Sequence, residues 1–149
     1  MIQDGNGLLV PQYFNPDDDV FEVIQGKDGQ PIGGAAEWVV SADSAANDVG
    51  LAAKAGVAGS RHYVTMIEAV VSGAAVGQTP IAITLSDDVT VVFKRILKAA
   101  AAIGDVITVQ FGKPIAITVA KAANLGSEAA GAGSIITLNM AGYTVKTSV

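Results

Sequence analysis

The chain has 149 residues, of which 50% are hydrophobic and only 15% are charged, and its formal net charge is −5. A typical soluble domain carries roughly 25% charged residues, so alanine and glycine stand here where charge is usual. The nine Lys and Arg residues are scattered, which excludes the clustered basic surface that nucleic-acid binding needs, and the absence of cysteine excludes disulfides and thiolate metal sites.

The length predicts one domain with a single core of ordinary size. Residues 1–5 lack the basic and apolar regions of a signal peptide. The longest mostly apolar run, 89–103, contains Lys94, Arg95 and Lys98, so it does not supply the ~20 apolar residues of a membrane span. We therefore expect a protein made in the cytoplasm that binds no membrane.

Residues 1–35 differ in composition from the rest and hold three prolines and an acidic run at 17–19. Turn-forming residues at 15–17 and 27–29 flank a short predicted strand, 20–24. We expect an extended N-terminal arm ordered by contact with the body or with a neighbouring subunit, and a loose terminus is the alternative. Val20, Phe21 and Val23 are the arm's candidate interface residues.

The body, residues 36–149, begins with a predicted strand at 37–40 that contains Trp38, a residue of the core or of an interface. The segment 42–58 is rich in alanine, aspartate and glycine. It predicts either one short helix over 48–55 or a loop, because alanine favours the helix while Gly50 and Gly56 oppose it.

From residue 61 onward, short strands follow one another at roughly 8–12-residue spacing, separated by turn residues. Apolar residues alternate at 81–85, 107–111, 115–119 and 136–140, a two-residue period that excludes helices. A turn is expected at 112–114 and a small-residue loop at 124–133. The sequence predicts an all-β, antiparallel β-sandwich of about eight strands, which favours a jelly-roll-like fold over a seven-stranded immunoglobulin fold.

The strand positions that should face water carry small or apolar residues instead of charge. A water-facing sheet normally alternates apolar with polar residues, and an uncharged face avoids a desolvation cost when another protein covers it. We therefore expect a homo-oligomer or docking on a larger lattice, with a compact monomer as the alternative. These positions are Ala82, Thr84, Thr90, Val92, Val106, Thr108, Ala116, Thr118 and Ala120.

His62 is the only histidine, so any histidine-based catalysis would have to use it. Ser60 lies two residues away on the same strand, which does not form a nucleophile elbow. We expect His62 at a surface or an interface, and at a subunit interface its titration would make assembly sensitive to pH near 6.

Carboxylates at 17–19 and 87–88 lack the D-x-D-x-D-G spacing of a calcium loop, and solvated turn residues are the simpler interpretation. Glu68 is the main carboxylate within a strand, and we expect it to pair with Arg61 or Lys94 or to face solvent. No glycine-rich loop with a lysine precedes a helix, so a phosphate cradle is not expected. The sequence predicts no catalytic residue, metal ligand or cofactor.

Several segments resemble small virion proteins of tailed bacteriophages. Those proteins share a basic-His-hydrophobic strand closed by small residues, a later apolar strand, a Phe-x-x-Pro turn and a Gly-Tyr-Thr ending. The matching segments here are RHYVTMIEA at 61–69 with SGAA at 72–75, TVVF at 90–93, FGKPI at 111–115 and GYT at 142–144. The segment 23–30 is also similar to the leaders of such proteins.

The resemblance covers about the last ninety residues and implies a β-sandwich cement or decoration protein on the outer capsid surface. The implied partner is the major capsid protein, and for the homo-oligomer we expect a trimer rather than a dimer. The segments 42–58 and 99–102 depart from the short turns of the family and leave the oligomeric state open. A fibre or tail-tip module that binds a host glycan is the alternative function, and an enzyme would need a polar pocket that the sequence does not predict.

Overall fold

The computed structural model describes residues 12–15, 20–23, 36–88 and 90–147, and forms two units, Met1–Ala35 and Ala36–Val149. The first unit contains strands β1 (Gln12–Asn15) and β2 (Val20–Val23), which pair antiparallel with Gln12 opposite Val23. The predicted strand at 20–24 is therefore present as β2.

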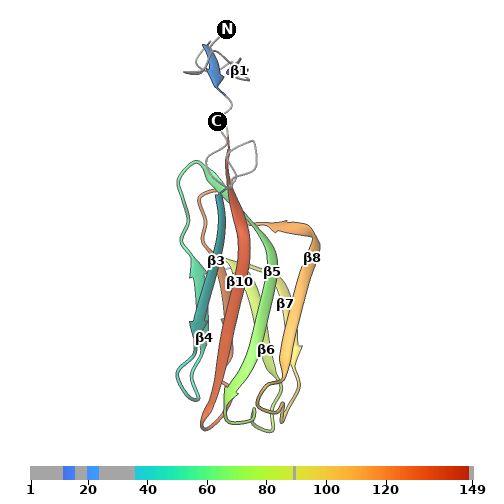
Figure 1. Ribbon diagram of the computed structural model, residues 1–149. Coiled ribbons are helices and arrows are strands. Elements are labelled where there is room, and N and C mark those ends of the chain that lie inside the picture. The colour runs from blue at the N-terminus through green and yellow to red at the C-terminus, as the bar shows by residue number, and fades with distance from the viewer. Residues whose placement is uncertain (1–11, 16–19, 24–35, 89, 148–149) are drawn as a thin grey trace. The chain divides into compact units, whose positions relative to one another are not determined.

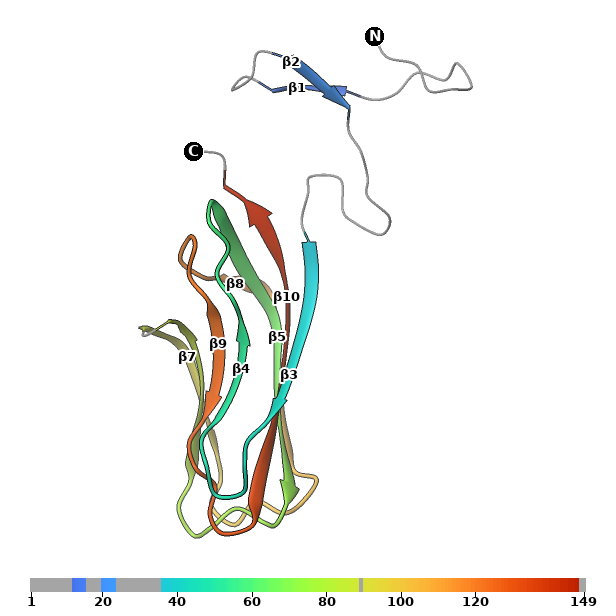
Figure 2. The same ribbon diagram turned by 90° about the vertical axis from the view of Figure 1, so that its left-hand side faces the viewer.

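The second unit is an all-β sandwich of two packed antiparallel sheets, each with four strands. The first sheet has the order β3-β10-β5-β8 and the second the order β4-β9-β6-β7. Figure 2 shows the two sheets as two layers. The strands are β3 (Ala36–Asp43), β4 (Gly50–Lys54), β5 (Ser60–Gly73), β6 (Ile81–Asp87), β7 (Thr90–Leu97), β8 (Val106–Ala116), β9 (Ala123–Ser127) and β10 (Ser134–Lys146).

The chain passes from one sheet to the other at nearly every connection. Among the described strands of the sandwich, only β6 and β7 follow each other within one sheet. In consequence β10, the last strand, lies between β3 and β5 at the centre of its sheet (Figure 1). Strands β3 and β4 form the edges on one side of the sandwich, and β7 and β8 form the edges on the other.

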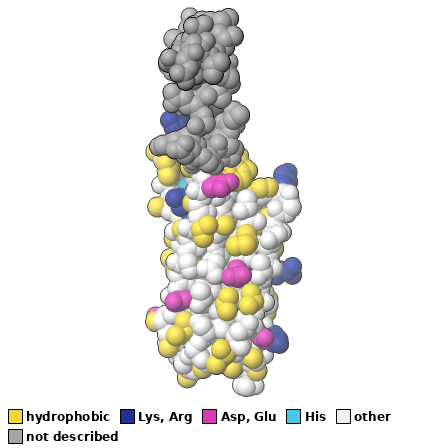
Figure 3. Space-filling model, viewed as in Figure 1, with side chains coloured by type: hydrophobic (Ala, Val, Ile, Leu, Met, Phe, Trp, Pro, Cys, Tyr) yellow, Lys and Arg dark blue, Asp and Glu magenta, His cyan; other side chains and the backbone are white. Residues whose placement is uncertain are grey.

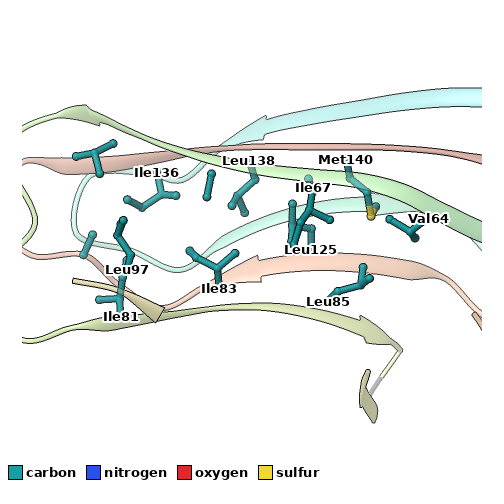
Figure 4. Packing of buried hydrophobic residues seen from close by; sticks show 14 of the residues in the cluster. Val64, Ile67, Ile81, Ile83, Leu85, Leu97, Leu125, Ile136, Leu138 and Met140 are labelled. Carbon is teal, nitrogen blue, oxygen red and sulfur yellow. The ribbon is translucent and has the colours of Figure 1, made fainter. Parts of the chain in front are cut away.

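The core lies between the sheets and comes from alternate residues of each strand. In Figure 4, Ile136, Leu138 and Met140 of β10 point toward residues of β6 and β9. Each such buried side chain stabilises the fold by about 1.5–3 kcal/mol relative to an exposed one. The largest fully buried apolar side chains are Ile67, Ile83, Leu85, Ile117, Leu125, Ile136, Leu138 and Met140.

Two predicted loops are strands. Residues 50–54, expected as part of a helix or loop, form β4, and residues 123–127, expected at the start of a loop, form β9. The two strands pair with each other, and Ala52, Ala123 and Leu125 are buried between the sheets. Alanine and glycine have low strand propensity, so these two strands form because they pair with each other and bury side chains in the core.

The predicted turn at 112–114 lies within one strand, β8. Gln110 pairs with Met66 and Ile115 pairs with Val64, so residues 111–114 stand opposite Thr65 alone. This bulge accommodates Pro114, which has no backbone N–H to donate to a ladder. A second bulge lies in the β6–β7 ladder beside Leu85, so Val91 pairs with Ser86 and is exposed instead of sharing a face with Phe93.

Candidate interaction surfaces

The outer face of the β4-β9-β6-β7 sheet, here called the small-residue face, carries one charge, Lys94, within its paired strands, and Glu128 borders it just after β9. Its residues on β4, β6 and β9 alternate with buried core residues, so they point away from the other sheet, and its residues on β7 lie opposite outward positions of β6. A surface with so few charges loses little hydration energy when another protein covers it. The residues are Leu51, Ala53, Thr84, Ser86, Val91, Lys94, Ile96, Asn124 and Gly126.

Ala82 departs from this pattern, since its sequence position predicted an outer-face residue but its side chain is buried. Glu128 lies beside it: its carboxylate accepts a hydrogen bond from the Ala82 N–H at 2.7 Å, and the Glu128 N–H donates to the Ala82 carbonyl at 3.1 Å. The pairing of Ala82 with Glu128 therefore extends the β6–β9 ladder one residue beyond the end of β9.

The β7/β8 edge, formed by β7, β8 and the connection between them, exposes large apolar side chains. Between the two strands lies a hollow of about 320 Å³ lined by Ile96, Leu97, Val106 and Ile107 with Lys98 and Asp105. Phe93 and Phe111 meet edge to face between the strands at 5.0 Å. The exposed apolar residues are Val91, Val92, Ile96, Ile103 and Val106.

The β3/β4 edge also exposes apolar side chains. Val39 on β3 is 74% exposed and Leu51 on β4 is 58% exposed, and Val49 precedes β4. Both edges therefore offer apolar surface beside backbone groups that no other described strand pairs.

The outer face of the β3-β10-β5-β8 sheet, which Figure 3 shows toward the viewer, is more polar. Glu68 does not pair there with Arg61 or Lys94, as the sequence suggested. Its carboxylate accepts hydrogen bonds from Asn139 at 2.9 Å and from Thr108 at 3.2 Å, so it joins three strands.

A second hollow, of about 430 Å³, opens beside β3, β10 and β5. Its lining includes Glu37, Val39, Thr65 and Tyr143. The ring of Tyr143 stacks on Tyr63 at 5.1 Å with an interplanar angle of 13°.

His62, expected at a surface or an interface, is inside the sandwich and only 1% exposed. Its Nε2 lies 2.9 Å from the Ala55 carbonyl oxygen, which can only accept, so Nε2 carries a hydrogen. Its Nδ1 lies 2.7 Å from Thr144 Oγ1. Both ring nitrogens are thus occupied, and neither is left for a dyad with Ser60.

The other candidate interface residues divide between the two units. Trp38 is buried, and its ring meets His62 edge to face at 5.8 Å. Val20, Phe21 and Val23 lie on β2, but their side chains are outside the described part of the structure. The acidic run at 17–19 lies outside the described residues as well.

Asp87 and Asp88 are held by groups of the β8–β9 connection. Asp87 accepts a hydrogen bond from Thr118, and the Lys121 ammonium lies 2.9 Å from the Asp88 carboxylate. This contact with Lys121 holds the pKa of Asp88 below its usual value, and Asp88 raises the pKa of Lys121. The Asp88–Lys121 ion pair therefore connects the β6–β7 turn to the β8–β9 connection.

Asp105 makes similar contacts in the connection between β7 and β8. Its carboxylate accepts a hydrogen bond from the Ala102 N–H at 3.0 Å and pairs with Lys98 at 3.2 Å. The backbone hydrogen bond from Ala102 and the Lys98 ammonium together hold the pKa of Asp105 below its usual value.

Within 36–88 and 90–147, and in the short described strands before them, no three His, Asp or Glu residues gather as metal ligands. None of the described residues forms a helix long and apolar enough to cross a membrane. Comparison with family models, with curated proteins and with solved structures gives no match for this chain.

Sequence reasoning did not find the two sheet edges or the two hollows. Their residues come from strands far apart in the chain, and which strands lie at an edge follows only from the pairing order. The sequence held one sign of the β3/β4 edge: Val39 and Leu51 are apolar residues that belong to no complete alternating pattern.

Proposed function

We propose that this chain is a structural, non-enzymatic virion protein that decorates and stabilises a bacteriophage capsid by binding the outer surface of the coat lattice. The observation that carries the proposal is the small-residue face, where Lys94 is the one charged residue within the paired strands and Glu128 borders the face at the end of β9. A face of this composition suits broad contact with another protein surface. The resemblance of the sequence to phage virion proteins supplies the kind of partner.

The order of the strands supports the same proposal. Two four-stranded antiparallel sheets joined by crossing connections, with the last strand between the first and third of the body, support a jelly-roll interpretation, since a jelly roll has eight strands in two sheets. Viral capsid domains use the jelly-roll architecture, as do lectins and cupins. We infer on this basis that the body, 36–149, is a jelly roll with an N-terminal arm.

The mechanism is thermodynamic. A protein that binds the assembled shell but not its separated subunits stabilises the shell by mass action, by about 2.7 kcal/mol for each site when its free concentration is a hundred times Kd. Such stabilisation needs neither a cofactor nor a reactive group, and His62, the only histidine, is committed to Thr144 and Ala55 within the fold.

The test is reconstitution on particles of the phage that encodes the chain, made without it. Purified protein should co-sediment with these particles at a fixed stoichiometry and raise the temperature at which the shells release DNA. Particles that bind none of the protein would overturn the proposal.

The glycan-binding alternative is favoured by one observation, the stacked Tyr63 and Tyr143 near the hollow that Glu37 and Thr65 help to line. Aromatic faces beside hydrogen-bonding groups are the arrangement that sugar rings use. If this function holds, the purified chain binds host-surface polysaccharide, Tyr143→Ala abolishes that binding, and particles made without the chain take up none of it.

A further inference from the structure

The two side edges of the sandwich carry opposite charge and both expose apolar side chains. We propose that copies of this chain associate head to tail, with the β7/β8 edge of one copy against the β3/β4 edge of the next. This inference deepens the proposed function, because it names the surfaces through which the decorating subunits contact one another.

The β7/β8 edge is basic. Lys94 and Arg95 project from β7 and Lys113 from β8, all three exposed, and no ion pair joins them to another described residue. Lys98 adds a fourth cation, which Asp105 partly neutralises. Lys and Arg atoms stand along the right-hand side in Figure 3, where Figure 1 places β8.

The β3/β4 edge is acidic. Glu37 and Asp43 on β3 and Asp48 before β4 are exposed and form no ion pair with described residues. Lys54 is the cation of this edge, and it is half-buried with its ammonium 6.0 Å from the centroid of the Trp38 ring. The two edges therefore differ in sign while each keeps apolar residues beside its charges.

Pairing across the sheet places one acid and one base at the same height on opposite edges. Glu37 stands in line with Tyr143, Tyr63 and Ala116, and Lys113 lies in the β8 bulge just before Ala116. Copies set side by side at equal height thus bring Lys113 of one beside Glu37 of the next.

Strand direction favours the same arrangement. Neighbours alternate in direction across each four-stranded sheet, so β3 and β8 run opposite ways, as do β4 and β7. Two copies in the same orientation therefore meet through antiparallel edge strands in both sheets, the pairing that edge backbone groups readily adopt.

Apolar groups add to the contact in the second sheet. Leu51 stands in line with Thr84 and Lys94, so in this arrangement it lies near Ile96 of the next copy, two residues along β7. In the first sheet Val106 stands in line with Asp43 and not with Val39. The hollow of about 320 Å³ beside Ile96 offers space for an apolar side chain of the neighbour.

A contact between two different surfaces is heterologous, so it closes into a ring or continues as a filament according to the rotation between neighbours. The trimer that we expect from the sequence is one such ring.

The test is sedimentation velocity of the full chain over a thousandfold range of concentration. Glu37→Lys or Lys113→Glu should each weaken association roughly tenfold at low salt, because each places like charges at the joint. The double variant restores the opposite pair and should recover most of the loss. Lys146→Glu, at the exposed end of the central strand β10, is the matched control and should leave association unchanged.

A second pair of variants tests the apolar contact without depending on charge pairing. Leu51→Asn should reduce association at least tenfold, whereas Val57→Asn, which makes an equally polar, uncharged change at an exposed valine of the β4–β5 loop, should not. Circular dichroism of both variants verifies that the body is folded.

The outcomes separate this inference from the proposed function. Loss with either single charge variant and recovery in the double variant support head-to-tail association. A monomer at every concentration, or an oligomer that none of the edge variants weakens, overturns it even if particles bind the chain. Failure to bind particles overturns only the proposed function.

Discussion

The hydroxyl of Thr144 lies 2.7 Å from Nδ1 of His62, across the ladder that joins β10 to β5. The Ala55 carbonyl requires hydrogen on Nε2, and the Thr144 hydroxyl is the partner of Nδ1, the other ring nitrogen. The single histidine is thus a hydrogen-bonded member of the interior, and it ties the start of β5 to the end of β10.

Thr144→Val keeps the shape of the side chain but leaves Nδ1 of His62 without its partner. We expect the free energy of unfolding to fall by about 1–3 kcal/mol, the cost of an unsatisfied buried polar group. Urea denaturation measures this change. Thr108→Val, which removes an exposed hydrogen bond to Glu68, is the control, and equal losses in the two variants would contradict the assignment.

Gly142 sits where β10 passes closest to Trp38. A Cβ at this position would overlap the carbonyl oxygen of Tyr63 and lie 2.7 Å from Cζ2 of Trp38. We expect Gly142→Ala to lower the free energy of unfolding by about 1–3 kcal/mol, as overpacking does. Gly112→Ala meets no atom within 4 Å and should be nearly neutral, so a similar loss there would show that the close approach is not the cause.

The Asp88–Lys121 pair predicts a specific pH dependence. Because the pKa of Asp88 is lowered on folding, the pair stabilises the fold above about pH 4 and loses this effect as the pH falls through the lowered pKa. The pKa of Lys121 is raised, so its contribution is complete below about pH 10 and is lost as the pH rises through the raised value.

Lys121→Gln should therefore lower Tm slightly at pH 7, and the difference from the unmodified protein should vanish near pH 2. Since both groups are exposed, 1 M salt should also shrink the difference. Thermal melts between pH 2 and pH 7 test this, with Lys146→Gln as the control. A difference that is constant across that range would contradict the role of the pair.

The small-residue face predicts where capsid binding fails. Thr84→Arg places a long cation on β6 at the centre of this face, and it should abolish co-sedimentation with particles while self-association persists. Thr137→Arg makes the same change on β10, at the centre of the other sheet. If both variants bind particles equally well, the small-residue face is not the contact.

Removal of residues 1–35 separates the first unit from the sandwich. The body, Ala36–Val149, has its own core, so it should melt within a few degrees of the full chain. Capsid attachment should weaken because the arm's contacts are lost. Unchanged occupancy on particles would remove the arm from the binding mechanism.

The sequence predicted the strands whose inner residues are large and alternate, such as β6 and β10. It missed β4 and β9, because alanine and glycine carry no period and those strands exist through pairing with each other and burial of Leu125. It also placed His62 outside, since a lone histidine on a strand does not show that Ala55 and Thr144 will satisfy both nitrogens.

The sequence predicted which kinds of residue face outward, but not which strands lie at the edges of the sheets. Strand alternation correctly indicated small residues facing outward at Thr84 and Thr108. Which strands border solvent depends on contacts between β3 and β10 and between β5 and β8, which are distant in the chain, so the opposite charges of Glu37 and Lys113 had no visible relationship in the sequence.

A reconstruction of the phage particle tests the central claim most directly. The proposal predicts density for the eight-stranded sandwich on the outside of the shell, with the small-residue face against the coat and the two edges against sister subunits. Particles that lack this density, or that hold the chain with that face open to solvent, would contradict it.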